Sequence, residues 1–373
     1  MKISNLVKLH IVSFDIPYPP NYGGAIDVFY KLKTLSEIGV SITLHTFEYK
    51  KERQDELLKY CDKVFYYSRN SIVRSLISTL PFIVKSRANL LLISNLKKDT
   101  VPILFEGLHT TYPLLYEDFS NRKIFVRMHN IEDDYYNGLA KSETNQAKKA
   151  FFKSESRKIK NYEPILTKAD FILAISPNET AYFKKKFKEK VVFIPPFHQF
   201  KDVLDLSSKG DFALYHGDLR ISDNKRAAEF LLEVFTEINY PLVLAASFLP
   251  KELKSKIDLE TNVSFVNITK DGVLDSLFER AQLHVLPTFQ KTGIKLKLIN
   301  SIYAGRFVVA NDAMLAQTGL EEICVQADSK EDMRKAIRKI ISLDYSKKEI
   351  DLKKRLIQKF DTKKSAKKII DLL

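Results

Sequence analysis

The stretch VLPTFQKTGIKLKLINSIYAGRFVVAND, residues 285–312, decides the fold. Its apolar start has the composition of a buried strand, which ends at Pro287. After a polar loop, Leu296, Ile299 and Tyr303 recur every three or four positions, and this spacing predicts a helix. Gly305 suits the end of that helix, and the apolar run after it predicts another buried strand. A strand, loop, helix and strand in this order predict an α/β sheet, in which ligands bind at the carboxyl ends of the strands.

Length and composition predict a two-domain globular protein. The chain has 373 residues, of which 45% are hydrophobic and 28% charged, so two domains of roughly 150–200 residues are expected. No apolar run reaches the roughly 18 residues of a membrane-spanning helix, and the N-terminus lacks a cleavage signal, so we expect a soluble, unprocessed chain. Cys61 and Cys324 match no metal-binding spacing and are expected to be reduced core residues of a cytoplasmic protein.

The net charge of +14 calls for an anionic partner or a solvated surface. Lysines gather at 50–53, 184–190 and 363–368, and basic residues interrupt the apolar stretch 71–96. Basic residues among apolar ones suit an anionic membrane surface. A lysine-rich solvated surface explains the same charge, and nucleic acid would also attract it. Because the chain has no recognisable nucleic-acid-binding motif, we do not expect nucleic acid as the partner.

The first half begins with a predicted strand at 6–14, a proline-rich loop and the pair Gly23 and Gly24. A helix is predicted over 25–38 and a second strand over 40–46. The two glycines permit close approach of the backbone to a phosphate or a sugar hydroxyl at the helix N-terminus. A purely structural turn is the alternative.

Two histidines follow predicted strands of the first half. His109 comes after the strand 101–105, and His129 comes after the strand 123–128. A histidine at a strand's carboxyl end can donate to a substrate hydroxyl or a transferred phosphate, because its pKa lies near neutrality. The alternative is a structural histidine in a loop. Further along, Ser176 and Glu179 have the spacing of a capping box, and residues 197–210 are the predicted linker.

The second half repeats the alternation of strands and helices. Gly217 follows the strand 212–216, and a helix is predicted to begin near residue 223, so backbone amides and Lys225 are candidates to hold a pyrophosphate, with Arg220 nearby. Lys295 and Lys297 flank the start of the helix in the opening stretch, where donors to a diphosphate are expected. An exposed lysine pair is the alternative there. With five strands expected in each half, the sequence predicts two doubly wound Rossmann-like domains facing a cleft.

Five segments carry a resemblance to a known family. They are PPNYGGA (19–25), VRMHN (126–130), TKADFILAISPNET (167–180), YHGDLRISDNKRAAEFLLEVF (215–235) and the block 263–312. Together, and in this order, they resemble the GT-B glycosyltransferases of the retaining family-4, or group 1, type over nearly the whole chain. The resemblance implies an acceptor-side domain at 1–200, a nucleotide-sugar domain at 201–358, and a C-terminal helix at 359–373 that crosses back to the first domain.

The donor block departs from the family pattern at specific positions. Where relatives commonly carry two glutamates, this chain has Thr292 and Asn300, which hydrogen-bond without carrying charge. Asp218 replaces the usual arginine, with Arg220 nearby as a substitute, and Lys225 does not reproduce the usual lysine spacing. Lys297 aligns with the phosphate-binding lysine of a family variant. Gly293 and Lys295 complete the implied donor site.

The resemblance implies a retaining sugar transfer from a nucleotide sugar of the UDP or GDP type to a glycan or lipid-linked acceptor, in surface polysaccharide or glycoconjugate biosynthesis. His129 and His109 would orient donor hydroxyls, and Gly23 and Gly24 would shape the acceptor side. No cofactor and no metal are expected, because the chain has no Asp-x-Asp motif and cationic side chains can neutralise the leaving diphosphate. The expected location is the cytoplasm, or the inner face of the cell membrane as a peripheral protein.

Two other functions fit the same architecture. A nucleotide-sugar 2-epimerase would convert a free nucleotide sugar without an acceptor. A non-catalytic sugar-nucleotide binding protein would bind the donor without hydrolysis or transfer, and the missing glutamates favour this alternative.

Overall fold

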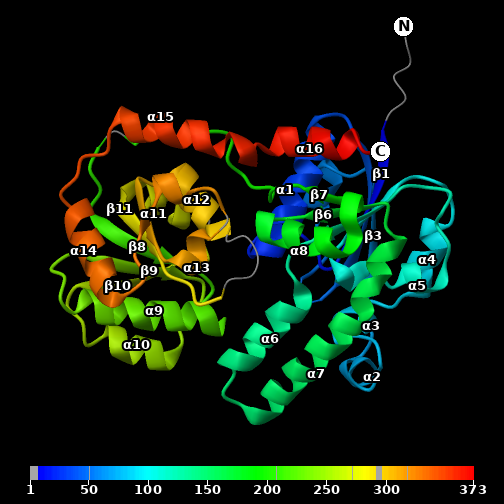
Figure 1. Cartoon of the computed structure of the whole chain (residues 1–373), viewed down its shortest axis with the longest axis horizontal. Coiled ribbons are helices and arrows are strands. Elements are labelled where there is room, and N and C mark those ends of the chain that lie inside the picture. The colour runs from blue at the N-terminus through cyan, green and yellow to red at the C-terminus, as the bar shows by residue number, and fades with distance from the viewer. Residues whose placement is uncertain (1–6, 50, 207, 271, 291–295, 317) are drawn as a thin grey trace, which may run out of the picture. The chain divides into compact units, whose positions relative to one another are not determined.

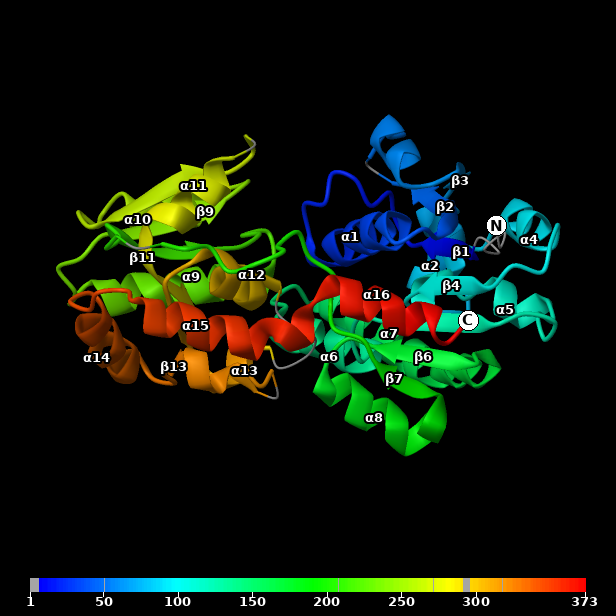
Figure 2. The same cartoon turned by 90° about the horizontal axis from the view of Figure 1, so that it is seen from above.

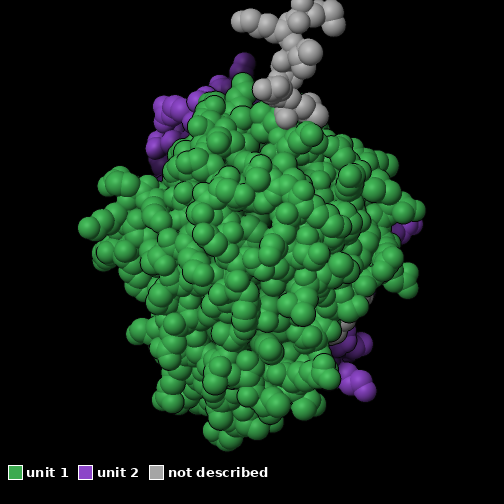
Figure 3. Space-filling view, turned by 90° about the vertical axis from the view of Figure 1, so that its right-hand side faces the viewer, with its two compact units in different colours: residues 1–199, 292–294, 360–373 green, residues 200–291, 295–359 purple. Residues whose placement is uncertain are grey.

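The computed structural model describes residues 7–49, 51–206, 208–270, 272–290, 296–316 and 318–373 (Figure 1). It contains two compact units, coloured separately in Figure 3. Unit 1 holds the described residues up to Gln199 together with Phe360–Leu373, and unit 2 holds the described residues between Phe200 and Lys359. Each unit is built on one parallel sheet.

The sheet of unit 1 has seven strands in the described part of the chain, in the order β3-β2-β1-β4-β5-β6-β7. The strands are β1 (Lys8–Ser13), β2 (Ser41–Glu48), β3 (Lys63–Ser68), β4 (Ile103–Glu106), β5 (Ile124–Met128), β6 (Phe171–Ala174) and β7 (Val191–Phe193). All the pairs are parallel, and β1 pairs with β2 on one side and with β4 on the other. The strand order therefore reverses between β1 and β4.

The helices of unit 1 follow its strands. They are α1 (Gly23–Glu37), α2 (Ile72–Leu76), α3 (Phe82–Lys85), α4 (Leu90–Leu96), α5 (Pro113–Tyr116), α6 (Glu132–Ser142), α7 (Gln146–Tyr162), α8 (Pro177–Phe187) and α16 (Thr362–Ile370). A short 3-10 turn, η2 (Leu108–Thr110), follows β4. Ser176 accepts from the backbone N–H of Glu179 at 3.3 Å and so caps α8, as its sequence spacing predicts.

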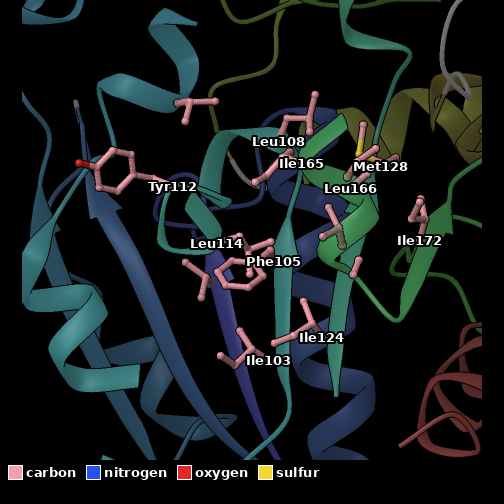
Figure 4. Close-up of a cluster of buried hydrophobic side chains, with 14 of the residues drawn as sticks. Ile103, Phe105, Leu108, Tyr112, Leu114, Ile124, Met128, Ile165, Leu166 and Ile172 are labelled. Carbon is pink, nitrogen blue, oxygen red and sulfur yellow. The ribbon is translucent and has the colours of Figure 1, made fainter. Parts of the chain in front are cut away.

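The central strands of unit 1 are buried on both faces. Figure 4 shows Ile103, Phe105 and Ile124 in one hydrophobic cluster with side chains from the helical and turn segments above them. Leu104 and Phe125, which alternate with these residues along β4 and β5, belong to the cluster on the other face. A parallel sheet covered on both sides requires such continuous apolar strands, and this is why they can be recognised in the sequence.

The C-terminal helix α16 belongs to unit 1, although the helices directly before it, α9 to α15, belong to unit 2. It packs beside α1, as Figures 1 and 2 show. Its buried side chains Ala366 and Ile369 join Val28, Leu32 and Leu35 of α1 in one cluster. Four lysines, at 363, 364, 367 and 368, form the exposed side of α16, so this helix is strongly amphipathic.

The sheet of unit 2 has six strands in its described residues, in the order β10-β9-β8-β11-β12-β13. They are β8 (Phe212–His216), β9 (Leu242–Ala246), β10 (Val263–Asn267), β11 (Ala281–Leu286), β12 (Phe307–Ala310) and β13 (Val325–Gln326). The helices are α9 (Ser222–Phe235), α10 (Lys251–Ile257), α11 (Val273–Arg280), α12 (Leu296–Ala304), α13 (Asp312–Leu315), α14 (Lys330–Ile340) and α15 (Lys347–Leu356). Here the strand order reverses between β8 and β11.

The predicted fold class, two doubly wound Rossmann-like domains, is confirmed. The predicted count of five strands in each half is wrong, because the described residues form seven and six. The strand missed in unit 2, β13, has only two residues and both are exposed, so no apolar run marks it. Helix α7 begins at Gln146 because the side chain of Asn145 caps it by accepting from Lys148 N.

Within the described residues, no helix is long and apolar enough to cross a membrane.

We expect Ile369→Ala to destabilise unit 1 by about 2–5 kcal/mol, because the side chain is fully buried against α1 and its loss leaves a cavity. The measurement is urea unfolding followed by circular dichroism. Leu58→Ala, at a position 58% exposed in the same unit, is the matched control and should change the unfolding free energy by at most about 0.5 kcal/mol. Equal stability of the two variants would show that α16 does not support unit 1.

Candidate functional site

Each sheet has one place where neighbouring loops diverge. The order of strands reverses between β1 and β4 in unit 1 and between β8 and β11 in unit 2. In open parallel sheets, ligands bind at the carboxyl ends of the strands at such a reversal, because the two loops leave in opposite directions. These two places hold the candidate sites.

In unit 2, Lys297 lies beside the glycine that ends β8. Its Nζ donates to Asn224 Oδ1 at 2.7 Å and lies 3.4 Å from the hydroxyl of Tyr215. A Cβ added to Gly217 would approach this Nζ to 3.2 Å, so the absence of a side chain leaves room beside the ammonium group. The Asn224 amide also donates to Asp218 O at 3.0 Å and thereby holds the loop after β8. A cation is thus held close to the backbone at the point where the strand order reverses.

The loop after β11 is anchored from two sides. Asp223 accepts from Thr288 Oγ1 at 2.6 Å and from Phe289 N at 2.9 Å. Asn311, directly after β12, accepts from Thr288 N and donates to Thr288 O. The guanidinium of Arg226 stacks over the Phe289 ring at 3.9 Å. Side chains from α9 and β12 therefore fix where this loop leaves the sheet.

The other residues predicted for the donor site have different surroundings. Arg220 is exposed and forms a two-point ion pair with Asp218, with both hydrogen bonds at 2.8 Å. Lys225, on α9, donates to Glu252 of α10. Asn300 is half-buried on α12. Thr292, Gly293 and Lys295 lie outside the described residues. The structure therefore brings Gly217 and Lys297 together, while Arg220 and Lys225 are paired with carboxylates.

Two buried histidines of unit 2 have a structural role. Ser301 Oγ lies 2.9 Å from His284 Nδ1 and 3.3 Å from His216 Nε2. Burial lowers the pKa of His216 to about 3, and burial together with the nearby Lys353 and Arg306 lowers the pKa of His284 well below its usual value. Both rings are therefore neutral at physiological pH and link β8, β11 and α12.

In unit 1, the diglycine forms the first two residues of α1, which begins two residues earlier than predicted. A Cβ on Gly24 would lie 2.7 Å from Phe14 Cζ, so the close packing of this ring on the helix requires a glycine. The Phe14 ring contacts the rings of both predicted histidines. Its centroid is 5.3 Å from that of His109 and 5.5 Å from that of His129. The two histidines and the diglycine loop therefore meet at the reversal between β1 and β4.

His129 belongs to a buried network of charged side chains. Its Nε2 lies 3.0 Å from Glu106 Oε2, and its Nδ1 lies 3.8 Å from Asp27 Oδ2. Lys31 donates to both carboxylates, at 2.7 Å to Glu106 and 2.9 Å to Asp27. Arg127, at the end of β5, forms two hydrogen bonds to Asp27, at 2.9 and 3.1 Å. Two cations and two anions thus face each other behind His129.

The cations keep both carboxyl groups ionised. Burial opposes ionisation of Asp27, but the charges of Arg127 and Lys31 outweigh it and hold the pKa of this carboxyl below its usual range. Burial likewise opposes ionisation of Glu106, while Lys31 and His129 lower its pKa. An ionised carboxylate only accepts hydrogen bonds, so His129 donates its Nε2–H to Glu106. This bond sets the orientation of the imidazole ring.

The same residues form the one group of three metal-ligating side chains found in the described part of the chain. Ligand atoms of Asp27, Glu106 and His129 all lie within 4.8 Å of one another. However, Lys31 and Arg127 already occupy the lone pairs of the two carboxylates that a cation would need. We therefore assign this cluster to ion pairing.

His109 stands on the turn η2 next to this network. Burial, together with the charges of Arg87, His129 and Arg69, lowers the pKa of His109 well below its usual value, so its ring is neutral. Its Nδ1 is buried without a hydrogen-bond partner in the described residues. A neutral imidazole with an unused nitrogen is suited to bind a ligand hydroxyl.

Sequence reasoning missed the residues that support His129. Lys31 and Arg127 each interrupt an otherwise apolar pattern, one in α1 and one in β5, and both side chains are fully buried. A charged residue inside a buried strand is the signal that was available, because a buried charge requires a partner. The identity of the partners was not available, since Asp27 and Arg127 lie far apart in the chain.

Residues 211–342 match the model of the family described as Glycosyl transferases group 1. An "Uncharacterized 44.6 kDa protein in cps region" of Klebsiella pneumoniae is 27% identical over 340 residues, covering 84% of this chain and 85% of that protein. The crystal structure of TarM superposes with a TM-score of 0.70 at 13% identity, over 100% of this chain and 99% of that one. A TarM variant of S. aureus, in complex with Fondaparinux, alpha-GlcNAc-glycerol and UDP, gives 0.68 at 14% identity, over 98% and 99%.

Two Rossmann-like units and these structural neighbours define the GT-B fold. The match of residues 211–342, within unit 2, to the Glycosyl transferases group 1 model, together with the GT-B neighbours, indicates a glycosyltransferase.

We expect Asp27→Asn to destabilise the protein by about 3–5 kcal/mol, because it leaves Arg127 and Lys31 buried without their shared counter-charge. Urea unfolding at neutral pH is the measurement. Since the folded pKa of Asp27 is lowered, its contribution is present at neutral pH and is lost as the pH falls below about 4, toward the folded pKa. Glu56→Gln, which breaks an exposed pair with Lys59, should cost at most about 1 kcal/mol. A similar small cost for Asp27→Asn would contradict the network.

Proposed function

We propose that this glycosyltransferase moves a sugar from a UDP- or GDP-type nucleotide sugar to a glycan or lipid-linked acceptor, with retention of configuration and without a metal. The reaction belongs to the biosynthesis of a surface polysaccharide or glycoconjugate. The observation that carries the proposal is the position of Lys297, whose ammonium group lies beside Gly217 at the reversal of the sheet in unit 2.

Lys297 supports a diphosphate site by its charge and its surroundings. As the sugar leaves, negative charge grows on the diphosphate, and a positioned ammonium group stabilises that charge. The open space at Gly217 lets a phosphate approach both the Lys297 side chain and the backbone after β8. Asn224 and Tyr215, which hold the ammonium group beside Gly217, are uncharged side chains.

The chain supplies the remaining roles without a metal in this proposal. Arg220 stands in the same loop, and the ion pair with Asp218 would exchange for one with phosphate on donor binding. The leaving phosphate takes the proton of the acceptor hydroxyl on the same face, so no side-chain nucleophile is required. His109 and His129 orient sugar hydroxyls, with His129 held in position by Glu106.

Two relatives support the choice of substrates. The TarM complex contains UDP, which favours a uridine nucleotide as the donor of this chain. The Klebsiella pneumoniae relative is described by its place in a cps region, which favours a polysaccharide pathway.

We expect Lys297→Ala to weaken UDP binding by about 10-fold to 100-fold, because a charge-assisted hydrogen bond to phosphate contributes about 1.5–3 kcal/mol. Isothermal titration calorimetry with UDP, without added metal, is the measurement. Lys254→Ala is the matched control, since this lysine is exposed on α10 and paired with Asp258. Unchanged affinity in Lys297→Ala would remove the phosphate role, and a strict requirement for magnesium would contradict the metal-independent reaction.

We further propose that the acceptor-side unit docks on an anionic membrane surface from the cytoplasm. Four apolar side chains of one short segment are exposed, namely Ile72, Val73, Leu76 and Ile77. This segment, α2 and the residue after it, packs against α3, and α3 contacts α7 through the rings of Phe82 and Phe151 at 6.1 Å.

The neighbouring helix α7 provides the charge that such a surface needs. Its basic residues are Lys148, Lys149, Lys153, Arg157, Lys158 and Lys160, against the single carboxylate of Glu155. Each Lys or Arg near an anionic lipid surface contributes about 1 kcal/mol, and inserted apolar side chains add to the attraction. Exposed apolar residues beside a basic helix therefore match an anionic bilayer.

We expect Ile77→Ser to reduce binding to vesicles containing anionic phosphatidylglycerol by about tenfold, because an inserted side chain of this size contributes about 1.5–3 kcal/mol. Co-sedimentation with anionic and with neutral phosphatidylcholine vesicles is the measurement. Leu259→Ser is the control, since Leu259 of unit 2 is 83% exposed and Ile77 is 82% exposed. Equal binding of both variants, or equal binding to both kinds of vesicle, would rule out this docking surface.

A further inference from the structure

Two arginines of unit 1 share one backbone acceptor beside the diglycine loop. Arg87 Nε donates to Phe14 O at 2.7 Å, and Arg69 Nη2 donates to the same oxygen at 2.9 Å. Arg69 directly follows β3, and Arg87 lies two residues beyond the end of α3. Two separate segments of the chain thus place their guanidinium groups together at the carboxyl end of β1, where the strand order reverses.

Positive charge exceeds negative charge around this loop. Arg87 is only 6% exposed and forms no ion pair with any described carboxylate. Arg69 has one distant carboxylate, with Asp15 Oδ1 at 3.9 Å from its Nη2, and the other oxygen of Asp15 accepts from the hydroxyl of Tyr22. Lys51 adds a third cation by donating to the loop carbonyls of Ile16 and Pro19. Three cations therefore surround a loop that carries one carboxylate.

The excess charge is unfavourable without a ligand. Burial and the charge of Arg69 lower the pKa of Arg87 to about 9, and burial lowers the pKa of Arg69. Burial raises the pKa of the neighbouring Glu132 carboxyl to about 7, so this group is only partly ionised at neutral pH and compensates incompletely. A bound anion would remove this penalty, because a buried charge is stabilised by a hydrogen-bonded counter-charge.

Unused hydrogen-bond donors remain on both guanidinium groups. Arg69 Nε is buried without a partner among the described residues. Arg87 donates through Nε and Nη1, to Phe14 O, Ile83 O and Ser86 Oγ, while its Nη2 makes no hydrogen bond to a described residue. The nearby His109 Nδ1 is also buried and unpartnered. Guanidinium groups with free N–H donors match the geometry of phosphate and carboxylate oxygens.

We propose that Arg69 and Arg87 bind an anionic group of the acceptor, a phosphate or a carboxylate, and so restrict the acceptor to negatively charged glycans or lipid-linked sugars. This inference rests on the proposed sugar transfer, since it assigns the bound anion to the acceptor. The arginines act by binding and positioning, because the transfer itself requires only the acceptor hydroxyl and the leaving diphosphate.

The test measures anion binding to the full chain with the donor site already filled. The protein is saturated with UDP, and binding of inorganic phosphate is followed by broadening of its ³¹P resonance. Binding of glucuronate, the carboxylate probe, is followed by saturation-transfer proton NMR. We expect Arg69→Gln to weaken binding of the recognised anion at least tenfold. This variant keeps a donor for Phe14 O and avoids altering the buried Arg87.

Arg53→Gln is the matched control. Arg53 belongs to the same unit, is exposed, and has its own carboxylate in Glu48 and its own aromatic partner in Tyr66. Loss of phosphate binding in Arg69→Gln but not in Arg53→Gln supports a phosphate-bearing acceptor, and the same pattern with glucuronate supports a carboxylate-bearing one. Binding of neither anion, or equal binding by wild type and Arg69→Gln, overturns the proposal.

A variant with a disabled nucleotide site distinguishes this inference from the proposed function. The Lys297→Ala variant is tested with both anions in the absence of UDP. If adding Arg69→Gln to Lys297→Ala abolishes anion binding, the unit 1 site is supported. This holds even if UDP titrations of the wild type refute the nucleotide site. Normal UDP binding without any Arg69-dependent anion binding refutes the acceptor-anion site alone.

Discussion

The ion pairs of Asp27 are the interaction on which the candidate site of unit 1 depends. One carboxylate on α1 receives Arg127 from β5, Lys31 from the next turn of its own helix, and the backbone N–H of Phe197 after β7. All of these groups are buried, so each needs its partner. Leaving one buried charge unpaired would destabilise the fold by more than a single exposed ion pair stabilises it. The network therefore fixes the helix, the strand ends and His129 relative to one another within unit 1.

In unit 2, hydrogen bonds that involve fewer charged side chains hold the loops at the strand reversal. The loop after β11 is held by Asp223 and Asn311, and Lys297 is held by Asn224 beside Gly217. These contacts join α9, α12 and the ends of β11 and β12 at the strand reversal. A parallel sheet presents the carboxyl ends of its strands along one edge, so side chains distant in sequence meet there. Both units thus obtain a binding edge from the same topology, one with a buried ion network and one with a single lysine.

The candidate site residues were predicted from their positions along the chain, and their roles stay predictions. His109, His129, Gly217 and Lys297 were chosen because each follows a predicted strand or lies at the start of a predicted helix, positions that periodicity reveals. Arg220 and Lys225 satisfied the same rule, yet the structure pairs them with Asp218 and Glu252, and periodicity contains no information on such pairing. The residues that orient His129 and those that hold Phe14 O were missed, because their partners come from other parts of the chain.

The sequence by itself determined the α/β class, the two Rossmann-like domains and the resemblance to group 1 glycosyltransferases, because a buried parallel strand needs an unbroken apolar run and helices need their own period. The tertiary structure alone decided which charges meet. Arg69 and Arg87 converge on one carbonyl, and Arg127 reaches Asp27. Charge pairing depends on distances of a few ångströms between segments far apart in the chain, and local sequence patterns do not contain those distances.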